Sequence, residues 1–455
     1  MIAAGLESQL MKNGKIKKRK MKINKIKVDT WIEPEYLAHF LASKFGEEGL
    51  SWLDSDNSEN GKYSFLGLNP KKIIYSKNDD LDNPFERLKE IKNGFWMGWL
   101  SYEAGKWLEP KQPWQKSKMA SLWIASYDPV IKFNLQKKEI ILEGNSLETL
   151  KKYQQIINKM NIKEVMKYLN KNITIDSSKI NLDNLNNKFK KNIIKIKKLI
   201  SQGDIFQANL TTKCELYLSE KYKYLDIYSK IRDKLKAPFG GIIIAKIHGK
   251  KEGVLSTSPE RFLKTDKEGY VETRPIKGTR PRHHDKKIDA LNAIELITNE
   301  KDRAENIMIV DLLRNDLGKV CEIGSIIVSE LLKLESYAKV HHLTSVVRGK
   351  IKQDKTWIDL LKACWPGGSI TGAPKIRACK RIYELEGFER GPYCGSFIKI
   401  DWDGSFDSNI LIRSFILKDQ IIKVYAGCGI VNDSNPVEEN AELNWKLLPL
   451  IESLK

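Results

Sequence analysis

The chain has 455 residues and a formal net charge of +20, and this length allows two or three domains with a sizeable core. Its apolar content of 41% is ordinary for a globular protein, and no apolar run reaches the roughly 18 residues that a membrane-spanning helix needs. The six cysteines form no C-x-x-C pair and lie near no histidine cluster. This pattern is typical of reduced thiols, so we expect a cytoplasmic protein without a membrane partner.

The positive charge admits nucleic-acid binding as one class of function, but most of it is lysine scattered along the chain. Eleven of the 14 arginines, by contrast, lie between Arg261 and Arg413. Arginine is suited to fixed, bidentate recognition of carboxylates. The clustering therefore favours an anionic small molecule over a nucleic acid.

The first 28 residues contain nine basic residues and one acidic residue, which predicts a disordered leader or an upstream start before Met21. Short apolar runs then alternate with turns, which predicts an N-terminal β-rich region over 29–160. Seven of the 11 tryptophans lie at or before Trp123. Their density favours a packed core, and a pocket for an aromatic effector is the alternative.

Helical spacing marks the lysine- and asparagine-rich stretch 150–198, with a linker predicted at 172–184. From there to the end, 183–455, glycine, proline and arginine fall at the junctions of apolar segments, which predicts a β-rich α+β region with irregular loops. We predict strands at 240–247 and 409–417, and helices at 296–317 and 436–450.

Two of these predicted helices each carry a carboxylate pair three residues apart, which places both members on one helix face. The pairs are Asp302 with Glu305, and Glu439 with Glu442. Carboxylate oxygens suit Mg²⁺, which keeps some waters and is often completed by a substrate anion. Each pair taken alone is equally typical of a solvated helix face, so spacing leaves both interpretations open.

The segment TRPIKGTRPR, residues 273–282, contains three arginines and a single lysine, Lys277. Arginine keeps its proton in proteins, whereas lysine can lose it and become a nucleophile. An exposed lysine among arginines is the alternative interpretation. Glycine-bearing turns at 366–375 and 426–431 could offer backbone N–H groups to an anion, although ordinary tight turns have the same composition.

Together these segments resemble the chorismate-utilising enzymes and, within that family, its aminodeoxychorismate synthase component I branch. The similar motifs occur in family order over about 199–446: GDIFQANL, SPERF, TRPIKGTRPR, DRAENIMIVDLLRNDLG, VHHLTSVV, PGGSITGAPK, GPYCGS, NILIRSF and AGCGIVNDSNPVEENAE. The resemblance implies an α+β fold of two large face-to-face β-sheets with helices on the outside. It also implies that the N-terminal region is interleaved with the catalytic region.

The resemblance joins the two carboxylate pairs around one Mg²⁺ that holds the ring carboxylate of chorismate. Glu305 and Glu442 are then the expected ligands, with Asp302 and Glu439 in direct or water-mediated support. Arg413 and the backbone amides near Gly427 and Gly429 are expected to take the enolpyruvyl carboxylate. The other substrate-binding residues that the resemblance implies are Gln207, Thr279, Ser369, Tyr393 and Lys446.

Within the family, anthranilate synthases carry alanine at the position of Lys277, and aminodeoxychorismate synthases carry lysine. The resemblance implies that Lys277 attacks C2 of chorismate as the C4 hydroxyl leaves, and that ammonia then adds at C4 and expels the lysine. Glu260 is the implied acid for the leaving hydroxyl, so we expect its pKa to lie above the usual 4.3. His342 matches the active-site histidine. Gln207 stands where isochorismate synthases carry a water-activating lysine, so we expect water to be a poor nucleophile.

The chain shows no cysteine elbow typical of a glutaminase, so we expect a separate glutamine amidotransferase subunit to supply ammonia. The expected product is 4-amino-4-deoxychorismate, on the route to para-aminobenzoate and folate. The nearest alternative is anthranilate synthase component I, followed by a basic nucleic-acid-binding protein and an inactive paralogue. A tryptophan site near the segment LSWLDSD, for an effector or a structural ligand, is a further possibility that the resemblance raises.

Overall fold

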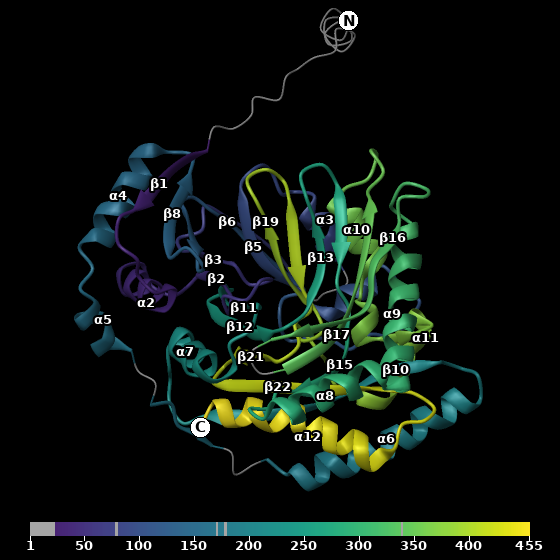
Figure 1. Ribbon diagram of the computed structural model, residues 1–455. Helices are drawn as coiled ribbons and strands as arrows, with labels where there is room; N and C mark the ends of the chain where they lie inside the picture. Colours follow the sequence, from purple (N-terminus) through teal and green to yellow (C-terminus); the bar gives the residue numbers. More distant parts are fainter. Residues whose placement is uncertain (1–22, 78–80, 170–171, 177–179, 338–339) are drawn as a thin grey trace, which may run out of the picture.

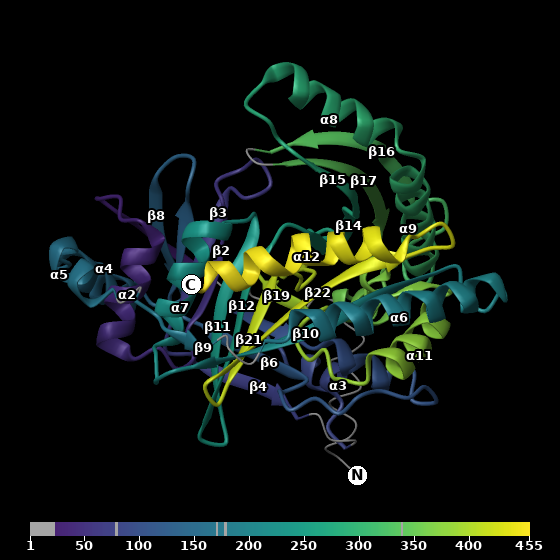
Figure 2. The same cartoon turned by 90° about the horizontal axis from the view of Figure 1, so that it is seen from below.

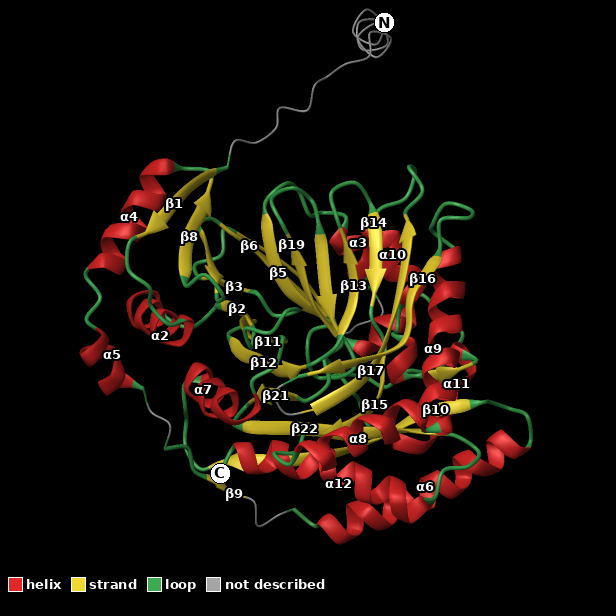
Figure 3. Ribbon diagram, viewed as in Figure 1, coloured by secondary structure: helices red, strands yellow, loops and turns green. Residues whose placement is uncertain are grey.

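Two large β-sheets and the helices around them make up the computed structural model (Figure 1), which describes residues 23–455 except 78–80, 170–171, 177–179 and 338–339. Within those residues, one sheet has 12 strands and the other has 10. Helices lie on the outside of the two sheets (Figure 3). The predicted fold class is therefore confirmed.

The 12-stranded sheet combines strands from both ends of the sequence, because β2 of the N-terminal region pairs antiparallel with β11. The order across this sheet is β1 (Asn24–Val28), β8 (Glu139–Gly144), β7 (Val130–Asn134), β3 (Tyr63–Gly67), β2 (Ser51–Asp54), β11 (Phe239–Ile247), β12 (Lys250–Ser258), β21 (Ser414–Lys418), β22 (Ile421–Ile430), β10 (Gln207–Leu218) and β18 (Gly372–Ala373), and β9 (Ile175–Asp176) also pairs with β10.

The 10-stranded sheet also combines strands from the N-terminal and C-terminal regions, because β5 pairs antiparallel with β19. Its order is β15 (Ile276–Pro281), β17 (Val340–Lys350), β14 (Tyr270–Thr273), β13 (Arg261–Thr265), β20 (Phe406–Asn409), β19 (Ser396–Ile400), β5 (Phe95–Leu100), β6 (Leu122–Tyr127) and β4 (Lys72–Ser76), and β16 (Ile327–Ser336) pairs with β17. Strands of the N-terminal and C-terminal regions thus share both sheets.

Helices cover the sheets and carry the acidic residues of interest. Against the first sheet lie α6 (Leu182–Ser201), α7 (Tyr224–Leu235), α11 (Lys375–Glu386) and α12 (Pro436–Ser453), with α12 beside α6 under β22 and β10 (Figure 2). Against the second lie α3 (Pro84–Leu88), α8 (Lys286–Thr298) and α9 (Glu300–Gly318), and α10 (Trp357–Cys364) packs on α9. The N-terminal helices are α2 (Pro34–Phe45), α4 (Leu147–Asn158) and α5 (Ile162–Tyr168).

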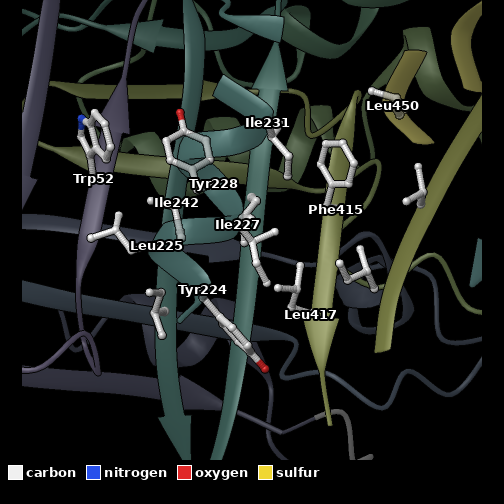
Figure 4. Packing of buried hydrophobic residues seen from close by; sticks show 14 of the residues in the cluster. Trp52, Tyr224, Leu225, Ile227, Tyr228, Ile231, Ile242, Phe415, Leu417 and Leu450 are labelled. Atoms are coloured by element: carbon white, nitrogen blue, oxygen red, sulfur yellow. The ribbon is translucent and has the colours of Figure 1, made fainter. Parts of the chain in front are cut away.

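Two apolar cores lie on opposite faces of the first sheet. Alternate side chains of β11 point to opposite faces, so Ile242 packs with the helices in one core and Ile243 packs in the other. The helix-side core includes Trp52, Tyr228 and Phe415 (Figure 4). The other core joins Ile243 to side chains of the second sheet such as Trp99, so it holds the two sheets face to face.

The buried tryptophans confirm the packed-core interpretation for four of the seven N-terminal ones: Trp52, Trp96, Trp99 and Trp123. All six cysteines are buried and unpaired, as the sequence predicts. Among the described helices, none combines the length and the apolar character needed to cross a membrane.

The structure differs from the predicted elements in three places. The predicted leader lies outside the described residues up to 22, but Asn24–Val28 forms β1, since Ile26 and Val28 alternate toward the core. The predicted helix over 296–317 is two helices that meet at Asn299, whose extended backbone and side-chain cap on Asp302 begin α9. The predicted strand over 409–417 is interrupted over 410–413, the last residue of which, Arg413, has a left-handed backbone (φ 48°).

Candidate active site

Lys277 lies on β15, the edge strand of the second sheet, at an irregularity in its pairing with β17. Such a bulge re-aims a side chain. The next residue, Gly278, has φ +80°, a conformation that glycine adopts without strain. The Lys277 side chain is only 12% exposed, and its Nζ lies 3.6 Å from Oε2 of Glu305 on α9. The bulge therefore turns the single lysine of TRPIKGTRPR inward to an acidic helix.

Glu260 follows β12 and is buried beside Lys277 and Ser369. Burial raises the pKa of its carboxyl to about 7, although the Lys277 charge and hydrogen bonds from Ser369 and the Ile276 backbone oppose the rise. The predicted upward shift of this pKa agrees with the structure. A carboxyl in this range can donate and accept a proton near neutral pH.

His342 lies on β17 directly opposite Thr279 of β15. The hydroxyl of Thr279 and Nδ1 of His342 are 2.9 Å apart. Burial, reinforced by the positive charge of Arg413, lowers the pKa of His342 to about 4. The imidazole is therefore neutral at physiological pH, where it can donate and accept hydrogen bonds.

Arg413 offers a guanidinium that no carboxylate of the described chain pairs with. Its backbone carbonyl accepts hydrogen bonds from the amide and the hydroxyl of Thr257, both at 3.0 Å, and these bonds hold the left-handed turn between β20 and β21. The side chain stays accessible to solvent even though protein atoms crowd around it. An unpaired guanidinium next to a buried neutral histidine is suited to an anionic ligand.

Gly429 on β22 lies where side chains from β10, α9 and β15 come together. A Cβ atom added there would lie 2.4 Å from Nε2 of Gln207, 3.3 Å from Oε2 of Glu305 and 3.5 Å from Nζ of Lys277. Gln207 is buried, and its Oε1 accepts no hydrogen bond from the described residues. Glycine at 429 thus leaves a small space whose walls are an amide, a carboxylate and an amine. Gly427 lies two residues earlier on the strand, where a Cβ would meet the backbone of Leu210 at 2.6 Å.

The two predicted carboxylate pairs face each other. Asp302 and Glu305 lie on α9, and Glu439 and Glu442 lie on α12. Lys301 of α9 reaches across to Glu439 at 2.5 Å. Burial raises the pKa of Glu305 and of Asp302, whereas Lys446 lowers that of Glu442 against the effect of burial.

These carboxylates could hold a hard divalent cation. Carboxylate oxygens are the ligands that Mg²⁺ prefers. Oε2 of the buried Glu439 has no hydrogen-bond partner among the described residues. Ligand atoms of Glu439 and Glu442 lie within 4.8 Å of each other, with the Cys428 thiol in the same group. The oxygen donors fit Mg²⁺, and the soft thiol does not contribute to that fit.

Two other predicted residues are Lys446 and Tyr393. Lys446 donates to Glu442 at 2.6 Å and to the carbonyl of Gly427 at 3.1 Å, so it lies beside the carboxylates. Tyr393 is buried and stacks on Tyr425 with ring centroids 4.8 Å apart. No contact given by the described structure brings Tyr393 against the other predicted residues.

Sequence reasoning missed two ion pairs at the site. Arg280 lies 3.2 Å from Asp302, and Lys301 bridges to Glu439. Lys301 directly precedes Asp302 in the sequence, but adjacency to one acid gives no sign of pairing with another 138 residues away. A large cavity of about 490 Å³ lies elsewhere, at Leu53, Asp54 and Phe239, and none of the predicted site residues lines it. The chemistry of the Lys277 cluster, and not cavity size, marks the candidate site.

Comparison with known proteins finds relatives over most of the chain. The family model for chorismate binding enzyme matches residues 51–452. The chain is 36% identical to an anthranilate synthase component I-like protein of Synechocystis, over 90% of this chain and 88% of that protein. It is 40% identical to aminodeoxychorismate synthase component 1 of Klebsiella aerogenes, over 57% of this chain and 56% of that protein. The crystal structure of anthranilate synthase component I from Streptococcus pneumoniae is 27% identical, with a TM-score of 0.71 over 88% of this chain and 93% of that one.

Proposed function

The chain belongs to the family of chorismate-binding enzymes, and within this family we propose that it is an aminodeoxychorismate synthase component I. It would convert chorismate and ammonia to 4-amino-4-deoxychorismate. The observation that carries the proposal is the inward position of Lys277, 12% exposed and 3.6 Å from Glu305. A lysine in this place has a role in covalent catalysis that an alanine could not have.

Two displacements give the proposed product. Lys277 first loses its ammonium proton to solvent. As a neutral amine, its Nζ then forms a bond to C2 of the ring while the C4–oxygen bond breaks, and Glu260 gives its proton to the departing hydroxyl, which leaves as water. Ammonia then forms a bond to C4 while the bond from C2 to Nζ breaks, so the lysine is regenerated. The ammonia nitrogen loses a proton, which returns Glu260 to its starting form. The pKa of Glu260, about 7, suits both directions of proton transfer.

Other side chains would bind and orient the substrate. Arg413 has no carboxylate partner among the described residues, so it is available for the enolpyruvyl carboxylate. His342 is neutral and held by Thr279, which fits a hydrogen-bonding role. Asp302, Glu305, Glu439 and Glu442 would hold Mg²⁺, which when bound would supply positive charge for the ring carboxylate.

Ammonia would come from a glutamine amidotransferase subunit. The similarity to aminodeoxychorismate synthase component 1 of Klebsiella aerogenes supports this part of the proposal. Free ammonium salts should replace the partner at high pH, because the fraction present as neutral ammonia rises with pH.

Anthranilate synthase component I is the second candidate function. The Synechocystis relative and the Streptococcus pneumoniae structure, whose names point to it, cover about nine-tenths of this chain. Lys277 is the observation against it, because this reaction needs no lysine at that position.

Product identification separates the two candidates. We expect the purified protein, incubated with chorismate, Mg²⁺ and ammonium at high pH, to form 4-amino-4-deoxychorismate, seen by liquid chromatography and mass spectrometry. Anthranilate as the sole product would overturn the proposal.

Lys277→Ala tests the covalent step. We expect the variant to lose the substrate-derived mass on the protein in acid-quenched samples and to lose at least 100-fold in formation of the C4-amino product. Lys286→Ala removes an exposed lysine nine residues further along and is the matched control, with unchanged turnover. An unchanged rate in Lys277→Ala would discard the mechanism.

A further inference from the structure

Each of the four carboxylates at the candidate metal site is matched with one basic side chain of the protein. The pairs are Asp302 with Arg280 at 3.2 Å, Glu305 with Lys277 at 3.6 Å, Glu439 with Lys301 at 2.5 Å, and Glu442 with Lys446 at 2.6 Å. Buried or half-buried carboxylates repel one another unless positive charge compensates them. A cation that bound them would therefore compete with charges that the chain already supplies.

Lys301 differs from the other three basic residues in what it connects. It projects from the first turn of α9 and pairs with Glu439 in the first turn of α12, so among the described ion pairs it is the one that joins these two helices. Lys446 pairs within α12, and Lys277 and Arg280 reach α9 from β15. Lys301 thus connects the same two helices that a shared cation would connect.

One of the two carboxylate oxygens of Glu439 is available to a cation. Its Oε1 accepts from both Lys301 and the Ser434 hydroxyl, at 2.5 and 2.6 Å, while its buried Oε2 has no partner among the described residues. The carboxylate is 2% exposed, whereas the Lys301 side chain is 40% exposed and can swing out to water. Two cations held a few ångströms apart repel strongly in such a weakly screened place.

We propose that Lys301 is the built-in counter-ion of this carboxylate site, and that a divalent cation binds by displacing its ammonium from Glu439. Lys301 then sets the cation affinity of the site without being a ligand. The inference depends on the metal-binding part of the function proposed above, but not on which product the enzyme makes.

Cation binding to the intact chain, without chorismate, tests the role of Lys301. Mg²⁺ titration by calorimetry and Mn²⁺ titration by electron paramagnetic resonance give the dissociation constant. We expect Lys301→Met to bind about tenfold more tightly than the wild type, because the competing charge is gone. Lys301→Gln, which keeps a hydrogen-bond donor for Glu439, should also bind more tightly, and Lys301→Arg should bind like the wild type.

Thermal melting gives a second readout that does not depend on activity. Without added cation, Lys301→Met should melt at a lower temperature than the wild type, because Glu439 is then buried without its partner. Saturating Mg²⁺ should raise its melting temperature by more than it raises that of the wild type.

Lys319→Met is the matched control. Lys319 lies on the same helix and pairs at 2.9 Å with Asp316, another carboxylate that is almost fully buried, but Asp316 belongs to no candidate site. Its cation affinity should equal that of the wild type. If the wild type binds Mg²⁺ and Lys301→Met binds it equally or more weakly, the inference fails alone. If neither protein binds Mg²⁺ or Mn²⁺, the metal-binding part of the proposed function fails with it.

Discussion

Burial acts on Glu260 and His342 in opposite directions, because it disfavours the charged form of each. The pKa of Glu260 rises to about 7, and the pKa of His342 falls to about 4. Near neutral pH the carboxyl is therefore the group that titrates, and the imidazole stays neutral. In the proposed mechanism, this division gives the proton transfer to Glu260 and leaves hydrogen bonding to His342.

The pH dependence of turnover follows from this assignment. In the proposed mechanism Glu260 must be protonated to release the hydroxyl, so we expect kcat to fall as pH rises through about 7. The rate should be measured at a constant concentration of neutral ammonia, since the ammonia fraction itself rises with pH. We expect Glu260→Gln to have a kcat at least 100-fold lower than the wild type and a pH–rate profile without the fall near pH 7. If kcat still falls near pH 7 in Glu260→Gln, another group carries out the proton transfer.

Stability should depend on pH through the same carboxyl. The folded protein binds more protons at Glu260 than the unfolded chain does between pH 4.5 and 7, so the free energy of unfolding should fall as pH rises through this window. Across this window, Glu260 lowers the free energy of unfolding by about 3 kcal/mol. In urea unfolding, Glu260→Gln should remove most of this pH-dependent loss. Glu103 is also buried with a pKa raised to about 7, but it lies outside the candidate site. Glu103→Gln should therefore weaken the same pH dependence of stability and leave the pH–rate limb in place.

At the scale of the elements, β22 approaches β10 and α9 closely at Gly429. In Gly429→Ala the added methyl would lie 2.4 Å from the Gln207 amide and 3.3 Å from Glu305. The amide must move into the site, so we expect kcat/KM to fall at least tenfold while the circular dichroism spectrum is kept. Gly318→Ala at the end of α9 is the control, since its methyl meets only Ile326 at 4.0 Å. Equal activity in both variants would contradict the crowding argument.

The apolar pattern of the sequence correctly predicted the elements in which that pattern is regular. The apolar spacing of 436–450 predicted α12, and the apolar run at 240–247 predicted β11. The junction at Asn299 was missed because an asparagine inside a helical pattern can cap a helix or simply lie in one. The break at Arg413 was missed because a left-handed arginine has no local sequence signature.

Part of the site was predictable, because the family motifs assign residues that lie far apart in the sequence to one site. They placed Lys277, Glu260, His342 and the two carboxylate pairs, which the structure brings together. The pairing of Lys301 with Glu439 and of Arg280 with Asp302 was not predictable, because both depend on how β15, α9 and α12 pack. Tyr393 came from the resemblance alone, and its stacking on Tyr425 gives it a core position.

For the whole molecule, the two sheets make the chain one cooperative unit despite its linker. β11 lies between β2 of the N-terminal region and β12, and β19 lies between β5 and β20. Without the N-terminal strands, both β11 and β19 would become exposed, apolar sheet edges, which favour aggregation. The core between the sheets would also lose Trp99 and Trp123, two of its largest side chains.

Splitting the chain tests this interdependence. We expect residues 177–455 expressed alone to aggregate, although they carry all the predicted site residues, because strands 1 to 9 of the two sheets are missing. Co-expressed with residues 1–176, they should co-purify as a complex that melts in one transition and turns over chorismate. Sedimentation, calorimetry and the product assay measure the three outcomes. If the 177–455 fragment is monomeric and active, the catalytic region folds independently and does not need the N-terminal strands.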